Sequence, residues 1–216
     1  MLTNLSKKNS LLSTWMRELR DSTIQTDRLR FRRNLERVGE IAAYEISKTL
    51  PYKKVAIQTP MGECSCAELA KQPVIATILR AGMPLQQGIL NYFDGADCAF
   101  VASFRKHNRD GSFKIHQSYL TAPETEGRPL IVADPMLATG SSLLLAIDDL
   151  LNGGEPTVIH IVTAIACTQG IEAVTRRYPA AHIWTGAIDE ELTARGYIVP
   201  GLGDAGDLSF GSKRQS

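Results

Sequence analysis

The segment that decides the fold is Leu130-Ile131-Val132-Ala133-Asp134-Pro135-Met136-Leu137-Ala138-Thr139-Gly140-Ser141-Ser142. Its first four residues are apolar, as in a buried strand. The apolar residues that follow it recur at helical spacing: Leu143, Leu144, Ile147 and Leu150. A helix therefore begins near Ser141. The pattern predicts a strand that delivers a tight loop, residues 134–142, onto the amino end of a helix.

Such a loop is suited to bind phosphate. The first turn of a helix has unpaired backbone N–H groups and the positive end of the helix dipole, which stabilise a phosphate dianion. Gly140 allows close approach of the backbone, and Thr139, Ser141 and Ser142 add hydroxyl donors. No lysine follows Gly140, so the loop differs from that of nucleoside triphosphatases. We expect a phosphomonoester such as a sugar phosphate.

Asp134 comes directly after the strand, where open α/β sheets bind their ligands. Its carboxylate can accept hydrogen bonds from the diol of a ribose. An alternative is equally compatible with the residues: Asp134 and Thr139 cap a turn, with Pro135 and Gly140 as turn formers. Local sequence does not separate the two interpretations.

Strand-like and helix-like patterns alternate along the chain, which predicts an α/β fold with a parallel sheet flanked by helices. The expected strands are residues 55–58, 74–79, 98–103, 130–133, 158–165 and 182–184. The expected helices between them are residues 83–92, 141–151 and 170–177. An amphipathic helix, residues 26–50 with Thr26 as N-cap, precedes them. Its core side is Leu29, Leu35, Val38, Ile41, Ala42 and Ile46, and we expect its arginines on a solvated face.

Two segments break the alternation. Residues 106–127 are polar, with Asp110-Gly111 as a turn signal between alternating apolar residues, which predicts a projecting β-hairpin or hood. Residues 196–211 contain five glycines and Pro200, too many for a helix interior, so we expect irregular structure. Residues 1–216 are expected to form one domain.

Composition limits the classes of partner. Lys and Arg total 24 against 23 Asp and Glu, so no net positive field favours nucleic acid or an anionic membrane. The sequence lacks a signal-peptide pattern and an apolar run of about 20 residues, so we expect a cytoplasmic protein. The four cysteines, Cys64, Cys66, Cys98 and Cys167, are expected to be reduced and mostly packed inside, without a metal.

Three segments carry a resemblance to a known family. Residues 134–142 resemble the phosphoribosyl-pyrophosphate (PRPP) loop of type I phosphoribosyltransferases, and Asp-Pro-Met-Leu-Ala-Thr-Gly resembles the uracil branch. Residues 78–82 resemble that branch's pyrophosphate loop, and residues 196–207 resemble its uracil-binding segment almost residue for residue. Weaker similarity covers residues 19–21, 43–45 and 58–62. The resemblance implies a fold with a hood and conversion of uracil and PRPP to UMP and pyrophosphate in pyrimidine salvage.

The resemblance also implies which residues bind each substrate. PRPP would be bound by Arg80, Arg105, Asp134, Pro135, Met136, Leu137, Ala138, Thr139, Gly140, Ser141, Ser142 and Asp204. Uracil would be bound by Ile198, Gly203, Asp204 and Ala205. No residue is assigned as acid or base, and Arg80, Arg105 and Asp204 act as electrostatic stabilisers. Mg²⁺ would arrive with PRPP, with Asp204 as a candidate ligand, GTP as a candidate effector and a homodimer or larger homo-oligomer as the assembly.

The chain also departs from the family pattern. Ser141 replaces a glycine of the loop, which is tolerable because a residue that starts a helix needs no positive φ. Leu208-Ser209 replaces an arginine and a hydrophobic residue, and residues 105–122 match poorly.

Three other functions would require different sequence features. A regulator that senses UMP or PRPP and binds RNA would need a basic stripe. Purine and orotate transferases usually carry two adjacent acids where this chain has Asp134-Pro135. A member that binds ligands without turnover is disfavoured because Arg80, Asp134, Thr139 and Asp204 are retained.

Overall fold

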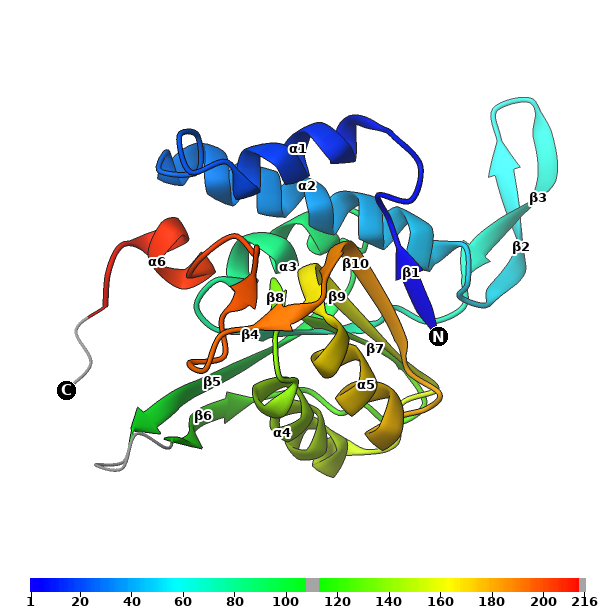
Figure 1. Ribbon diagram of the computed structural model, residues 1–216. Coiled ribbons are helices and arrows are strands. Elements are labelled where there is room, and N and C mark those ends of the chain that lie inside the picture. Colours follow the sequence, from blue (N-terminus) through cyan, green and yellow to red (C-terminus); the bar gives the residue numbers. More distant parts are fainter. Residues whose placement is uncertain (108–112, 214–216) are drawn as a thin grey trace.

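The structure is a computed structural model that describes residues 1–107 and 113–213, with only the backbone described for residues 103–107 and 113–118. Its centre is an eight-stranded sheet in the order β1-β10-β9-β7-β4-β5-β6, with β8 beside β9 (Figure 1). The strands are β1 (Leu2–Asn4), β4 (Val74–Ile78), β5 (Asp97–His107), β6 (Phe113–Thr121), β7 (Pro129–Ala133), β8 (Met136–Leu137), β9 (Val158–Cys167) and β10 (His182–Asp189). All paired neighbours run parallel except β5 and β6. The predicted parallel sheet is confirmed.

Strand order predicts a ligand crevice at the centre of the sheet. β4 and β7 are neighbours, with Thr77 of β4 paired to Ala133 of β7. The chain leaves β4 toward β5 on one side, and it leaves β7 toward β9 on the other. At such a switch point the loops after the two strands separate and leave room for a ligand at the carboxyl ends. The loop with Asp134 follows β7, so it lies at this crevice.

Helices cover both faces of the sheet (Figure 1). On one face lie α1 (Leu11–Arg20), α2 (Arg28–Ser47) and α3 (Gly82–Leu90). On the other lie α4 (Ser141–Leu150), the short 3-10 helix η1 (Leu151–Gly153) and α5 (Thr168–Arg177). The predicted helices 83–92, 141–151 and 170–177 correspond to α3, α4 and α5 to within two residues at each end.

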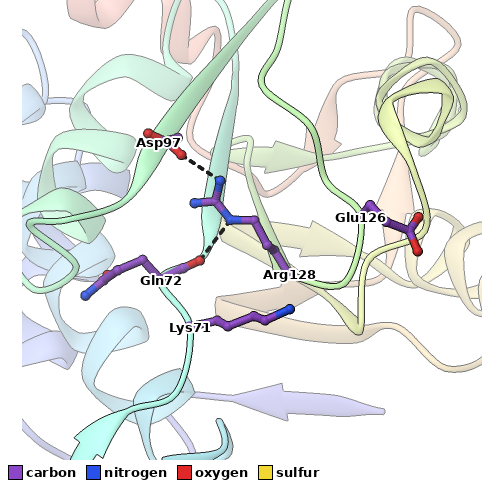
Figure 2. A pocket seen from close by; sticks show the side chains of 5 residues that line it. All are labelled: Lys71, Gln72, Asp97, Glu126 and Arg128. Carbon is purple, nitrogen blue, oxygen red and sulfur yellow. Dashed lines mark hydrogen bonds and ion pairs between the residues drawn. The ribbon is translucent and has the colours of Figure 1, made fainter.

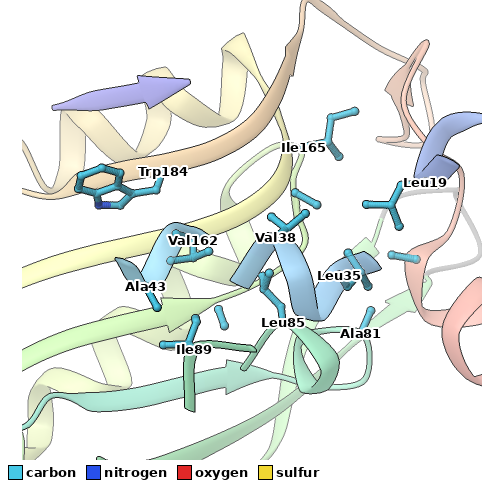
Figure 3. Packing of buried hydrophobic residues seen from close by; sticks show 14 of the residues in the cluster. Leu19, Leu35, Val38, Ala43, Ala81, Leu85, Ile89, Val162, Ile165 and Trp184 are labelled. Atoms are coloured by element: carbon cyan, nitrogen blue, oxygen red, sulfur yellow. The ribbon is translucent and has the colours of Figure 1, made fainter. Parts of the chain in front are cut away.

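Each helical layer has its own buried cluster. Figure 3 shows Leu35 and Val38 of α2 packed with Leu85 of α3 and with Val162 and Ile165 of β9. The second cluster joins the opposite face of the sheet to apolar residues of α4 and α5, among them Leu143, Ile147, Leu150 and Val174. Burial at about 25 cal/mol per Å² of apolar surface makes these clusters the main stabilising contribution of the fold.

Helices α2 and α3 approach each other unusually closely. A Cβ on Gly39 would overlap the carbonyl oxygen of Leu85, and one on Gly88 would overlap that of Glu36. Only glycine at these two positions lets the backbones meet. The contact fixes the direction in which α3 starts, and the loop between β4 and α3 is fixed with it.

The predicted amphipathic helix, residues 26–50, corresponds to α2, but its N-cap and one of its predicted core residues were wrong. The N-cap is Asp27, not Thr26, because the Asp27 carboxylate accepts the Arg30 N–H at 3.0 Å. Leu29, expected in the core, is 71% exposed.

The arginines of α2 do not all lie on a solvated face. Arg32 and Arg37 are half-buried. Arg32 donates to the Ser209 carbonyl at 2.7 Å, and the Arg37 guanidinium lies 5.2 Å from the centre of the Trp15 ring.

The expected strand 55–58 is not part of the parallel sheet. It lies in β2 (Tyr52–Thr59), which pairs antiparallel with β3 (Gly62–Leu69). This β2–β3 hairpin projects from the body of the molecule (Figure 1). Helix α1 and strand β1 were not predicted. β1 extends the sheet beside β10, and the Met1 ammonium donates to the Ala181 carbonyl at 2.7 Å.

The C-terminal segment is less irregular than its glycines suggested. It contains β12 (Ile198–Val199), which pairs with β11 (Glu191–Leu192), and α6 (Ala205–Phe210). α6 forms despite Gly206 because the Asp204 carboxylate caps it and accepts the Asp207 N–H at 3.0 Å. The expectation of no helix here was wrong.

The expectations for the hood, the cysteines and membrane-spanning helices have different outcomes. β5 and β6 pair antiparallel as far as His107 and Phe113, but the predicted Asp110-Gly111 turn lies outside the described residues and the hood stays a prediction. Burial of most cysteines was wrong: Cys64 and Cys66 are exposed, Cys98 is half-buried and Cys167 is buried. In the part of the chain described, no helix is both long and apolar enough to span a bilayer.

Candidate functional site

The loops after β4 and β7 meet at the carboxyl ends of these strands. Gly82 opens α3, and a Cβ on it would lie 2.8 Å from the Ala133 carbonyl oxygen and would overlap Thr77 Oγ1. The loop with Arg80 therefore packs directly on the end of β7, one residue before Asp134. The predicted pyrophosphate and PRPP loops are neighbours in space although more than 50 residues separate them in sequence.

The loop after β7 combines turn caps with an open helix start. The Asp134 carboxylate accepts the Met136 N–H at 3.3 Å, and Thr139 Oγ1 accepts the Ser141 N–H at 3.3 Å. Gly140 has φ of 82° and is the N-cap of α4, while Ser141 lies inside the helix. The turn-capping interpretation and the ligand interpretation are therefore compatible. Ser141 has no positive φ, as expected for a residue that starts a helix.

Helix α5 packs directly against this loop. A Cβ on Gly170 of α5 would lie 3.0 Å from the Leu137 carbonyl oxygen and would overlap that of Ala138. Gly140 also approaches α5, since a Cβ there would lie 3.4 Å from Ala173 Cβ. These contacts hold the first turn of α4, with its unpaired N–H groups, toward the crevice.

Arg80 links the loop after β4 to the C-terminal segment. One Nη of Arg80 lies 2.6 Å from the Asp207 carboxylate, and the other donates to the Gly211 carbonyl at 3.1 Å. Both side chains of the ion pair are 36% exposed. Asp207 thus holds the guanidinium of Arg80, which lies in the loop that resembles the family's pyrophosphate loop.

Asp204 lies beside this ion pair. Lys213 Nζ lies 3.0 Å from the Asp204 carboxylate and 3.9 Å from that of Asp207. Burial raises the pKa of Asp204, but hydrogen bonds from Asp207 and Lys213 and the charge of Lys213 outweigh it and hold the pKa below its ordinary value. Asp204 is therefore ionised at neutral pH. A Cβ on Gly206 would lie 3.1 Å from the Asp204 carboxylate and 3.2 Å from Arg80, so the three positions converge.

A buried carboxylate that the sequence did not single out anchors the same segment. Asp189, 7% exposed, accepts hydrogen bonds from Arg20 to both oxygens at 2.9 Å. It also accepts the Gly201 N–H at 2.8 Å. Gly201 has φ of 63°, and a Cβ there would overlap the Ile198 carbonyl oxygen. The available signals were the position of Asp189 after a strand-like run and the weak similarity around Arg20.

The other predicted base-binding residues lie along this anchored segment. Ile198 and Ala205 are buried, at 4% and 3% exposure, and Gly203 is exposed with φ of 89°. Arg105 lies on β5 beyond the stretch paired with β4, and its side chain lies outside those described. Binding of uracil and PRPP by these residues remains a prediction.

Comparison with known proteins identifies the family. A family model described as uracil phosphoribosyltransferase matches residues 6–212. The chain belongs to the uracil phosphoribosyltransferase family. A uracil phosphoribosyltransferase of Porphyromonas gingivalis is 48% identical over 211 residues, which cover 97% of this chain and 98% of that protein. The one of Pyrococcus furiosus is 38% identical over 197 residues, which cover 90% and 83%.

A solved structure has a similar fold over nearly the whole chain. The AQ2163 protein from Aquifex aeolicus is 28% identical and superposes with a TM-score of 0.86, over 98% of both chains. The fold is therefore shared with a solved structure, while the family assignment rests on the family model and on the relatives in sequence.

Two recesses lie away from the loops that follow β4 and β7. Figure 2 shows the first, about 340 Å³, lined by Lys71, Gln72, Asp97, Glu126 and Arg128. It lies at the amino ends of β4, β5 and β7, opposite the crevice, and its Arg128 is already bound to Asp97 at 2.6 Å. The second, about 400 Å³, lies at the start of the predicted uracil-binding segment, residues 196–207, here called the base segment, and is lined by Ile188, Asp189, Glu190, Glu191, Val199 and Pro200. Neither recess is lined by the loops that follow β4 and β7, where the predicted site lies.

The residues at the crevice suit Mg²⁺ only together with a phosphate ligand. In the described part of the chain, no three His, Cys, Asp or Glu side chains are grouped to hold a metal ion. Mg²⁺ commonly binds through one or two carboxylates plus substrate phosphates. The carboxylates of Asp134 and Asp204, at the carboxyl ends of the strands and on the base segment, fit that partial role.

Proposed function

We infer that this member of the uracil phosphoribosyltransferase family transfers the phosphoribosyl group of PRPP to uracil, giving UMP and pyrophosphate. One observation carries the inference. The loop after β7, the loop after β4 and the capped segment around Asp204 converge at the switch point of the sheet. The three segments that resemble a phosphoribosyltransferase site are distant in sequence, and chance similarity gives no reason for them to meet.

Each part of PRPP would contact a different group of residues in this arrangement. The start of α4 would hold the 5-phosphate, and Asp134 would accept hydrogen bonds from the ribose diol. Arg80 would leave Asp207 and Gly211 and turn to the pyrophosphate, where its planar, forked donors can bind two phosphate oxygens at once. Charge develops on ribose and pyrophosphate as their bond breaks, so Arg80, Arg105 and Asp204 act by electrostatic stabilisation.

The base segment would recognise uracil through its backbone. Uracil offers one donor and carbonyl oxygens, which the chain at Ile198, Gly203, Asp204 and Ala205 matches with carbonyls and N–H groups. Cytosine replaces a carbonyl with an amino group, which would leave a donor facing a donor. Each unpaired buried polar group costs about 1–3 kcal/mol, so uracil is selected.

The family resemblance extends the proposal to cofactor and assembly. Mg²⁺ would bind with PRPP, next to Asp204, and would neutralise phosphate charge. GTP would act as an effector, and the chain would form a homodimer or larger homo-oligomer in the cytoplasm. The metal, the effector and the assembly can each be tested independently of the transfer reaction.

A panel of bases tests the proposal. The purified protein is given PRPP and Mg²⁺ with uracil, cytosine, orotate or hypoxanthine, and the nucleotide formed is measured by chromatography. We expect nucleotide from uracil and at least about tenfold less from cytosine, which corresponds to one unpaired polar group. Activity on hypoxanthine or orotate with none on uracil would overturn the assignment.

A further inference from the structure

Four charged side chains lie together where the loop after β4 meets the C-terminal segment. Arg80 Nη2 lies 2.6 Å from the Asp207 carboxylate. Lys213 Nζ lies 3.0 Å from the Asp204 carboxylate and 3.9 Å from that of Asp207. The charges therefore form a chain in the order Arg80, Asp207, Lys213 and Asp204, in which Asp207 stands between two cations.

The turn that ends α6 brings Lys213 back to the start of that helix. Gly211, with φ of 87°, follows the last residue of α6, and its N–H donates to the Asp207 carbonyl at 2.8 Å. The Gly211 carbonyl accepts a hydrogen bond from Arg80 at 3.1 Å. Arg80 therefore holds both the Asp207 side chain and the turn that leads to Lys213.

Binding of pyrophosphate by Arg80 would take its ion-pair partner away from the Asp207 carboxylate. Both side chains are 36% exposed, so water screens the separated carboxylate only in part. The incoming phosphates are anions as well, and like charges repel each other at close range. In the described part of the chain, Lys213 is the other cation that contacts the Asp207 carboxylate.

Lys213 can change partner by a short movement. A hydrogen bond between an ammonium and a carboxylate is about 2.7–2.9 Å long, so Nζ needs to approach Asp207 by about 1 Å. Asp204 does not depend on Lys213 alone, because its carboxylate also accepts the backbone N–H groups of Gly206 and Asp207, the latter at 3.0 Å. The shift of Lys213 therefore leaves Asp204 with hydrogen-bond partners.

We propose that Lys213 is a positioning residue that replaces Arg80 at Asp207 when Arg80 turns to the pyrophosphate of PRPP. The inference rests on the proposed function, which assigns Arg80 to pyrophosphate. No covalent bond changes. In the free protein Arg80 neutralises Asp207, and in the PRPP complex Lys213 closes on Asp207 and neutralises it instead. Lys213 thus favours the release of Arg80 without touching the substrate.

Isothermal titration calorimetry on the full-length protein measures this exchange with PRPP and Mg²⁺ in the absence of uracil. Lys213→Met should weaken PRPP binding by about threefold to fivefold, the size of a partly exposed ion pair. Lys213→Arg keeps the charge and should restore most of the affinity. Ribose 5-phosphate lacks the pyrophosphate and leaves Arg80 on Asp207, so its affinity should be the same in both variants and in the unmodified protein.

A double-mutant cycle separates the exchange from a general attraction of phosphate by positive charge. Asp207→Asn removes the carboxylate and keeps the backbone N–H that caps α6. Because Lys213 acts through that carboxylate, Lys213→Met should not change PRPP affinity in the Asp207→Asn protein. Lys48→Met is the matched control, since it removes an exposed lysine that pairs with Glu45 at the carboxyl end of α2. It should bind PRPP as the unmodified protein does.

Each outcome bears on the exchange or on the transfer reaction. A loss of PRPP affinity that Lys213→Arg restores and that disappears in the Asp207→Asn background supports the exchange. Unchanged affinity in Lys213→Met, or an equal loss with and without the Asp207 carboxylate, would overturn it. A protein that shows the exchange with PRPP but forms no UMP from uracil would refute the proposed function alone.

Discussion

Replacing Asp189 with asparagine removes the charge that anchors the base segment and keeps the shape of the side chain. The carboxylate accepts two hydrogen bonds from Arg20 and one from the Gly201 N–H, all between 2.8 and 2.9 Å. Asparagine has one acceptor oxygen, so its NH₂ group would face a donor. Arg20 is 26% exposed, so solvent recovers part of the lost interaction.

The size of the effect follows from these contacts. A hydrogen bond to a charged group contributes about 1.5–3 kcal/mol, and breaking a fully buried ion pair costs about 3–5 kcal/mol. With Arg20 partly solvated, we expect Asp189→Asn to lower the free energy of unfolding by about 2–3 kcal/mol. The loosened turn at Gly201 should also raise KM for uracil more than KM for PRPP, because Asp189 holds Gly201 in the predicted uracil-binding segment.

Urea denaturation and steady-state kinetics measure the two quantities. Asp148→Asn is a matched control, since Asp148 pairs with Arg177 and Tyr178 on the opposite layer and is 41% exposed. It should cost about 1 kcal/mol or less and leave KM for uracil unchanged. An Asp189→Asn protein with unchanged stability, or with equal increases in both KM values, would refute the anchoring role.

Three further predictions concern the loop, the turn and a buried histidine. Asp134→Asn should raise KM for PRPP about tenfold with the melting temperature unchanged, and unchanged PRPP kinetics would remove the diol contact. Gly201→Ala should lower the free energy of unfolding by at least about 1 kcal/mol in urea, because φ is positive and Ile198 O blocks the Cβ; an equally stable variant would contradict this. Burial, with the charge of His182, lowers the pKa of His160 to about 4. The unfolded chain therefore binds the proton more readily than the folded protein between about pH 6.5 and 4. The free energy of unfolding should fall as pH decreases through that window. His160→Gln should flatten this pH dependence in urea titrations.

The central part of the fold was predictable because its information is local. Residues 130–142 contain strand, turn and helix start in continuous order, and the structure places β7 and α4 accordingly. The β2–β3 hairpin was not predictable in the same way. Alternation identified residues 55–58 as a strand, but nothing in that stretch says whether its partner is the sheet or the next strand.

The supports of the site depend on contacts distant in sequence. Asp189 and Arg20 are 169 residues apart, and each alone is an ordinary charged residue. Helix α6 was not predicted because the glycine content of residues 196–211 argued against a helix. The helix forms because the Asp204 carboxylate caps its first turn by accepting the Asp207 N–H. Arg80 was predicted to bind pyrophosphate, which stays a prediction, and its ion pair with Asp207 could be found only from the fold.

The central claim is that the three converging segments perform one transfer reaction. The most direct measurement is the simultaneous quantification of UMP and pyrophosphate when the purified protein receives uracil, PRPP and Mg²⁺. We predict equal molar amounts of both products, neither formed when uracil is omitted. PRPP binding without UMP, or pyrophosphate release without uracil, would contradict the account.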